Sequence, residues 1–100
     1  MAIGPAVAVA ILFEAMGKLT VFTTEPCSFC RNAKALLQSR GIDYEEINLA
    51  KDPLGRAELA KRTGLMTFPQ IVVDGETLGG FRELVDLDRT GGLATLKLAA

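Results

Sequence analysis

The two cysteines of this chain, Cys27 and Cys30, lie close together with two residues between them. The preceding segment, 18–23, is rich in β-branched and aromatic residues and predicts a strand. The following segment carries apolar residues at helical spacing and ends at Gly41, so a helix is expected to begin near Cys27. Those apolar residues are Ala33, Leu36 and Leu37. Positions i and i+3 share one helical face, so the two sulfurs can reach each other.

A cysteine pair of this kind can be half of a metal site, a structural bridge or a redox centre. The chain has no histidine, so its two cysteines leave a zinc site two ligands short, and no metal site is expected. A disulfide that closes so short a loop constrains the unfolded chain little, which makes a structural bridge the weaker reading. A strand–helix setting favours the redox centre. Helix-start N–H groups would lower the pKa of Cys27, the attacking thiol, from the roughly 8.5 of free cysteine. Cys30 would then be the resolving thiol, which attacks the mixed disulfide formed on Cys27.

The rest of the chain alternates strand-like and helix-like segments. Asp52-Pro53 is a helix start signal, and Asp74-Gly75 is a two-residue hairpin turn. The expected elements are strands at 18–23, 42–49, 69–73 and 76–78, and helices at about 27–40, 53–62, 81–89 and 93–97. Strand–helix–strand units imply a parallel half of the sheet, and the hairpin implies an antiparallel half. The pattern predicts one α/β domain in the order β-α-β-α-β-β-α-α.

Residues 1–15 are expected to be an appendage, disordered or loosely docked, and 16–100 the folded domain. The apolar run 2–13 is about a dozen residues long, whereas a membrane span needs about 20. No Lys or Arg precedes Lys18, as the basic region of a secretory signal would require. The formal charge of −1 gives no electrostatic reason to expect nucleic acid or an anionic membrane as partner. We expect a monomer in a reducing, cytoplasmic compartment.

Three motifs carry a family resemblance: Thr23-Thr24-Glu25-Pro26-Cys27-Ser28-Phe29-Cys30, Thr67-Phe68-Pro69-Gln70 and Gly79-Gly80-Phe81. With these motifs, the chain from Lys18 to Lys97 resembles the glutaredoxins. The resemblance implies a thioredoxin-like fold with a four-stranded mixed sheet flanked by helices. It also implies reduction of protein disulfides and glutathione mixed disulfides by a Cys27/Cys30 dithiol, with glutathione as reductant. The residues that it implies for glutathione binding are Thr24, Phe29, Thr67, Phe68, Pro69, Gly79, Gly80, Phe81 and Arg82.

The implied roles have a physical basis. The resemblance makes Pro69 a cis-proline facing the cysteines, which would expose the backbone of Phe68 for strand-like pairing with an extended thiol substrate. Gly79-Gly80 would let a peptide backbone approach, and the helix start that follows offers N–H groups to a carboxylate.

Two positions depart from the family pattern. Family members commonly carry lysine at the position of Thr24 and aspartate at the position of Arg82. Each exposed charge contact is worth on the order of 1 kcal/mol, so weaker glutathione binding is expected. Gly80-Phe81-Arg82 also resembles the ribonucleotide-reductase-associated redoxins, which take electrons from thioredoxin reductase. A third reading is a glutathione-dependent 2Fe–2S cluster carrier, in which Cys27 of two chains ligates one cluster.

Overall fold

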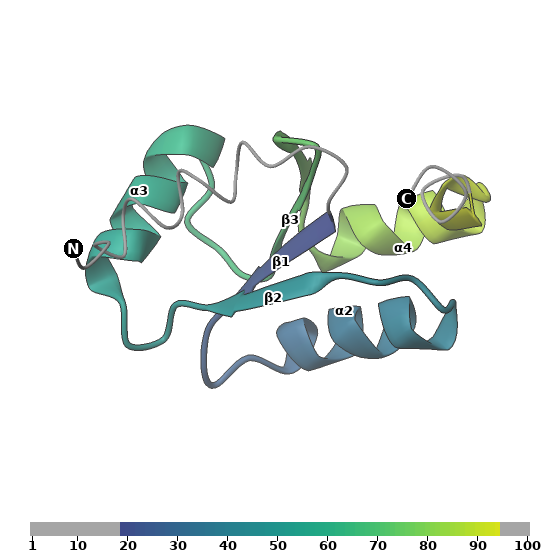
Figure 1. The fold of residues 1–100 in the computed structure, drawn as a ribbon, viewed down its shortest axis with the longest axis horizontal. Helices are drawn as coiled ribbons and strands as arrows, with labels where there is room; N and C mark the ends of the chain where they lie inside the picture. Colours follow the sequence, from purple (N-terminus) through teal and green to yellow (C-terminus); the bar gives the residue numbers. More distant parts are fainter. Residues whose placement is uncertain (1–18, 95–100) are drawn as a thin grey trace.

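A computed structural model describes residues 19–94 of the chain. Its elements, in chain order, are β1 (Leu19–Thr23), α2 (Ser28–Ser39), β2 (Glu45–Asn48), α3 (Pro53–Thr63), β3 (Gln70–Val73), β4 (Glu76–Gly79) and α4 (Phe81–Arg89). The four strands form one sheet in the order β2-β1-β3-β4 (Figure 1). β1 pairs in parallel with β2 and antiparallel with β3, and β3 and β4 form an antiparallel hairpin. The mixed sheet and the order of these elements are those predicted from the sequence.

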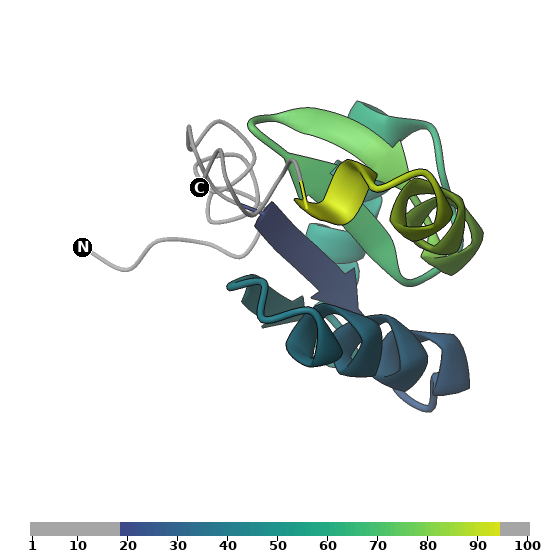
Figure 2. The same cartoon turned by 90° about the vertical axis from the view of Figure 1, so that its right-hand side faces the viewer.

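Helices cover both faces of this sheet. The cluster under α2 and α4 comprises Leu19, Val21, Ala33, Leu37, Ile42, Ile71, Leu84 and Leu93. The cluster under α3 comprises Phe22, Leu49, Leu59 and Val72. Successive strand side chains point to opposite faces, so the neighbours Val21 and Phe22 enter different clusters. Figure 1 shows α2 and α3 on opposite sides of the strands, and in Figure 2 α3 lies behind them.

Local signals account for the element ends. α3 begins at Pro53, directly after the N-cap residue Asp52. The Asp52 carboxylate accepts a hydrogen bond from the Gly55 N–H in the first turn at 2.8 Å. The same helix ends at Gly64, which has a left-handed φ of 75°. Asp74 and Gly75 have φ values of 51° and 79°, as a two-residue turn of type I′ requires. The predicted helix start, helix stop and hairpin turn are all confirmed.

The second strand is shorter than the sequence predicts. β2 comprises Glu45–Asn48, the residues in register with β1, whereas the prediction ran from 42 to 49. Ile42 and Leu49, which marked the two ends, lie beyond the strand and are 6% and 2% exposed. They enter different hydrophobic clusters. The Leu49 N–H still donates to the Thr23 carbonyl of β1 at 2.8 Å, so the prediction was one residue too long at this end. Ile42 is buried beside the strand, which the alternation pattern alone could not distinguish from pairing.

The described part of the chain ends within the last predicted helix. Residues 92–94 are helical, and the remainder of the predicted helix 93–97 lies outside the described residues. The predicted appendage 1–15 and the predicted strand start at Lys18 also lie outside them. None of the helices within 19–94 has the length and apolar character needed to span a membrane.

Candidate active site

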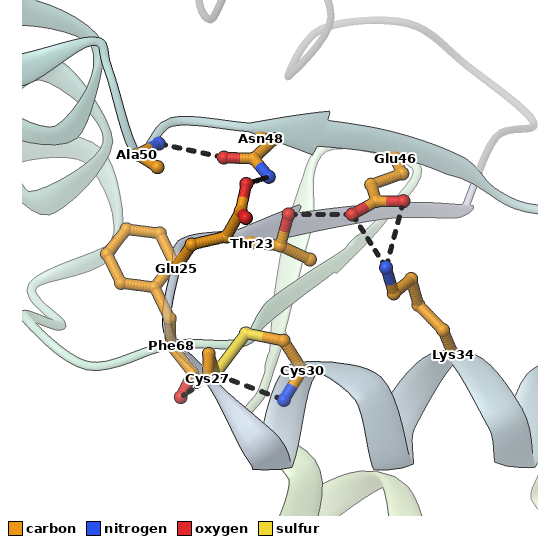
Figure 3. The surroundings of a disulfide bond; sticks show 9 residues. All are labelled: Thr23, Glu25, Cys27, Cys30, Lys34, Glu46, Asn48, Ala50 and Phe68. Atoms are coloured by element: carbon orange, nitrogen blue, oxygen red, sulfur yellow. Dashed lines mark hydrogen bonds and ion pairs between the residues drawn. A yellow bond between two sulfur atoms is a disulfide. The ribbon is translucent and has the colours of Figure 1, made fainter.

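Cys27 lies at the start of α2, after the loop that follows β1. Its backbone is extended, with φ −154° and ψ 101°, so it is the N-cap residue of the helix. Its sulfur accepts a hydrogen bond from the backbone N–H of Cys30 at 3.1 Å. The two cysteines form a disulfide, with Cα atoms 5.3 Å apart (Figure 3). Cys27 is partly exposed, whereas Cys30 is only 2% exposed. A reagent that arrives from solvent therefore meets the Cys27 sulfur.

The loop before β3 passes directly beside this sulfur. The Phe68–Pro69 peptide bond is cis, as the family resemblance implies. The Phe68 carbonyl oxygen lies 3.8 Å from Cys27 Sγ. In the disulfide this sulfur carries no proton, so the contact becomes a hydrogen bond only when Cys27 is a thiol. The Glu25–Pro26 bond is also cis, which the sequence did not predict.

Gln70 holds the same loop from the protein interior. It is 1% exposed, and its side-chain N–H donates to the Leu65 carbonyl at 3.0 Å. Its side-chain oxygen accepts a hydrogen bond from the Thr63 hydroxyl at 2.8 Å. The buried amide is thus paired on both sides, which ties the end of α3 to the start of β3. The sequence carries no signal for this role, since glutamine is ordinarily a surface residue.

The turn between β4 and α4 packs against the cis-proline loop. Gly79 has φ 132°, and a Cβ atom there would lie 2.6 Å from Glu83 Oε1. A Cβ atom on Gly80 would lie 3.4 Å from the Pro69 carbonyl oxygen. The Gly80 N–H donates to Glu83 Oε1 at 2.8 Å. This N–H group, at the helix start expected to bind a ligand carboxylate, is therefore held by Glu83.

Two contacts align α2 and α4 in the same direction. At the end that carries the disulfide, the rings of Phe29 and Phe81 stack with centroids 6.0 Å apart. At the other end, Arg40 donates to both carboxylate oxygens of Asp88, at 2.8 and 2.9 Å. The two helices are thus parallel, and both N-termini lie at the disulfide end (Figure 1). Both helix dipoles favour negative charge there, which suits a thiolate.

Polar side chains connect the surroundings of the disulfide to β2. The Thr23 hydroxyl donates to Glu46 at 2.9 Å, and Lys34 Nζ donates to the same carboxylate (Figure 3). Asn48 donates to the Glu25 carboxylate at 2.7 Å, which ties the loop before Cys27 to the end of β2. Within residues 19–94 there is no group of three or more His, Cys, Asp or Glu side chains that could hold a metal ion.

The three sequence motifs meet around the disulfide. The contacts that join them are Cys27 with Phe68 and Phe29 with Phe81. Gly80 lies close enough to Pro69 that an added Cβ atom would touch the Pro69 carbonyl oxygen.

Three other predicted binding residues stand apart from these contacts. Thr24 is half-buried in the loop after β1, whereas Thr67 and Arg82 are exposed. In the described part of the chain, none of the three has a hydrogen bond or ion pair with the cysteines.

Comparison with known proteins identifies this arrangement. The family model described as Glutaredoxin matches residues 19–78. Glutaredoxin 3 of Escherichia coli K12 is 40% identical over 81 residues, which cover 81% of this chain and 98% of that protein. Glutaredoxin of Pseudomonas aeruginosa is 41% identical over 81 residues, which cover 81% of this chain and 96% of that protein.

A solved structure extends the likeness to three dimensions. The holo form of glutaredoxin C1 from Populus tremula x tremuloides superposes with a TM-score of 0.83 at 26% identity, covering 96% of this chain and 98% of that chain. The thioredoxin-like fold implied by the sequence resemblance is confirmed. The curated relatives favour glutaredoxin activity over the thioredoxin-reductase-linked and cluster-carrier readings. The chain therefore belongs to the glutaredoxin family and is a glutaredoxin-like thiol–disulfide oxidoreductase.

Proposed function

We propose that Cys27 is the nucleophile and Cys30 the resolving thiol, and that glutathione is the reductant. The observation that carries the proposal is the unequal setting of the two sulfurs. Cys27 is partly exposed at the helix N-cap, and its sulfur receives the Cys30 N–H at 3.1 Å. Such an N–H and the helix dipole stabilise a thiolate. Cys30 is 2% exposed, and burial in apolar surroundings favours the neutral thiol.

The reaction balances through two exchanges. The Cys27 thiolate attacks one sulfur of a substrate disulfide, forms a mixed disulfide and releases the other sulfur as a thiolate, which takes up a proton. Cys30 then loses its proton and attacks the Cys27 sulfur, which closes the Cys27–Cys30 disulfide and releases the second substrate thiolate. Two molecules of glutathione reduce this disulfide and leave as glutathione disulfide. With a glutathione mixed disulfide on Cys27, a second glutathione can attack in place of Cys30.

Glutathione is proposed to lie along the exposed backbone of Phe68. Because the Phe68 carbonyl oxygen is 3.8 Å from Cys27 Sγ, a peptide that pairs with this backbone places its own sulfur beside Cys27. The Gly79-Gly80 turn packs against the same loop and would take the other end of the tripeptide. The residues proposed to contact glutathione are Thr24, Phe29, Thr67, Phe68, Pro69, Gly79, Gly80, Phe81 and Arg82.

The charges around this proposed site support weak glutathione binding. Thr24 offers no cation to a ligand carboxylate, and Arg82 is exposed at the start of α4. Glu83 already occupies the Gly80 N–H. We propose disulfide-bearing proteins as the second class of partner, a monomeric state and a reducing, cytoplasmic compartment.

Cysteine variants test the assignment of roles. In C30S, the mixed disulfide between Cys27 and glutathione should accumulate and be visible by mass spectrometry, while reduction of glutathione mixed disulfides continues. In C27S, both activities should be lost. Full reductase activity in C27S with complete loss in C30S would reverse the assignment.

A coupled assay tests the reductant. The protein is supplied in parallel with glutathione plus glutathione reductase or with thioredoxin reductase, and consumption of NADPH is followed. Turnover with the glutathione system is the expected result. Turnover with thioredoxin reductase alone would overturn the assignment of glutathione.

A further inference from the structure

One carboxylate joins the cysteine-bearing helix to two strands of the sheet. Thr23, the last residue of β1, is 1% exposed, and its hydroxyl donates to Glu46 Oε2 at 2.9 Å. Lys34 of α2 donates to both carboxylate oxygens of Glu46, at 3.0 and 3.2 Å. Glu46 belongs to β2 and therefore receives hydrogen bonds from two other elements (Figure 3).

Lys34 lies one helical turn after Cys30. Residues four apart share a helical face, with about 5–6 Å between their Cβ atoms. Helical side chains lean toward the N-terminus, and Figure 3 shows Lys34 leaning toward the end of α2 that carries Cys30. The side chains of Lys34 and Glu46 are 27% and 33% exposed, so water screens their charges only in part.

The other charged groups near the cysteines already have partners or lie in solvent. From the loop before α2, Glu25 accepts a hydrogen bond from Asn48 at 2.7 Å. From α4, Glu83 accepts the Gly80 N–H at 2.8 Å, and Arg82 is exposed. On α2 itself, Arg31 directly follows Cys30 and is exposed. The Lys34–Glu46 pair is the charged pair that shares a helical face with Cys30.

Without a neutralising anion beside it, the ammonium group of Lys34 would stabilise a thiolate on Cys30. We propose that Glu46 is a positioning residue that neutralises Lys34, and so keeps Cys30 protonated while Cys27 carries the thiolate. The inference rests on the proposed roles of the two cysteines. If Cys30 stays protonated, the mixed disulfide on Cys27 lives longer. The reason is that Cys30 must lose its proton before its sulfur can attack the Cys27 sulfur and release the substrate thiolate. A protonated Cys30 gives a second glutathione time to resolve the mixed disulfide instead.

The test titrates Cys30 alone. The chain has two cysteines, so in a C27S background the ultraviolet absorbance of thiolate reports Cys30. E46Q should raise the thiolate fraction of Cys30 at neutral pH by about threefold to tenfold, the effect of a nearby unpaired cation. K34Q should lower it, because Glu46 is then an unpaired anion on the same side. The double variant K34Q/E46Q should return to within about twofold of C27S alone.

Opposite signs in the single variants separate charge neutralisation from a merely structural tether. If the pair were only a structural tether, all three variants would change the thiolate fraction of Cys30 in the same direction. That result would overturn the proposal, and so would an unchanged thiolate fraction. Urea unfolding of each variant confirms that the proteins titrated are folded. The control is E58Q, which breaks the Glu58–Arg62 ion pair of α3 at 3.0 Å and should leave the Cys30 titration unchanged. Failure of the cysteine roles would be seen separately, in the trapping experiment with C30S.

Discussion

Phe29 and Phe81 stack across the starts of α2 and α4, with 6.0 Å between ring centroids and 29° between ring planes. Phe29 lies between the two cysteines and is 59% exposed. Phe81 follows the paired glycines and packs against the hydrophobic cluster under α2 and α4. The contact therefore joins the cysteine segment to the glycine segment through one partly buried ring and one exposed ring.

The alanine variants of this pair should differ in stability. F81A is expected to lower the free energy of unfolding by about 2 kcal/mol, since a partly buried ring loses less than a fully buried one. F29A should cost less than about 1 kcal/mol, because its ring is mainly in water. The double variant should lose less unfolding free energy than the sum of the two single losses. The difference should be roughly 0.5–1.5 kcal/mol, the energy of an aromatic pair. Urea unfolding of the four proteins measures this coupling, and additive costs would show that the stacked contact does not stabilise the fold.

Removal of the buried Gln70 side-chain amide should lower the stability of the fold. Q70L removes the side-chain donor to the Leu65 carbonyl and one of the partners of the Thr63 hydroxyl, so we expect a loss of about 1–3 kcal/mol in the free energy of unfolding. The loop beside Cys27 loses its anchor, and disulfide reductase activity should fall with it. Q38L is the matched control, because Gln38 is exposed and its replacement should change stability by about 0.5 kcal/mol or less. Equal costs for both variants would contradict the role given to Gln70.

Reversal of the charge at position 82 should strengthen glutathione binding. R82D supplies an anion at the start of α4, where the family commonly has aspartate, and an exposed charge contact is worth on the order of 1 kcal/mol. The KM for glutathione should fall about severalfold while kcat changes little. R89D makes the same change of net charge at the other end of α4 and should leave KM unchanged. An unchanged KM in R82D would place the charged groups of glutathione elsewhere.

The Arg40–Asp88 pair should make stability depend on acid pH. The hydrogen bond from Arg40 lowers the pKa of Asp88 below its ordinary value of 3.8. A carboxyl whose pKa is lower in the folded state stabilises the protein above the unfolded-state pKa and loses that contribution as pH falls through the folded-state pKa. The difference in unfolding free energy between wild type and D88N should therefore stay constant near neutral pH and shrink below about pH 4. The pair is exposed, so added salt should reduce the difference, and a gap that widens in acid would contradict the assignment.

Strong local signals predicted most of the fold. Asp52-Pro53, Gly64 and the Asp74-Gly75 turn each act on the backbone of their immediate neighbours, so a single sequence is enough to place them. The predicted start of β2 was wrong because Ile42 is buried without pairing to β1, whereas at the other end Leu49 keeps one backbone hydrogen bond to Thr23. Whether an apolar residue pairs or only packs depends on elements distant in sequence.

The candidate site divides in the same way. The sequence, through its motifs, predicted one site that contains the cysteines, Phe68-Pro69 and the paired glycines, because each motif carries its own chemistry. It missed the cap formed by Glu83, because the usual capping box requires a polar side chain at the N-cap and this helix has Gly80 there. It missed Glu46 because its partners Thr23 and Lys34 are distant in the sequence. It missed Gln70 because a glutamine carries no sequence signal of burial, although its partners are only five and seven residues away.

The difference in burial between the two sulfurs also bears on the kinetics of the protein. With Cys27 as the proposed nucleophile and Cys30 buried, electrons enter and leave through the Cys27 sulfur, so the donor and the acceptor compete for one atom. They cannot be bound productively together, and the first product must depart before the second reactant engages. We therefore expect ping-pong kinetics, seen as parallel lines in double-reciprocal plots, and inhibition by an excess of either reactant.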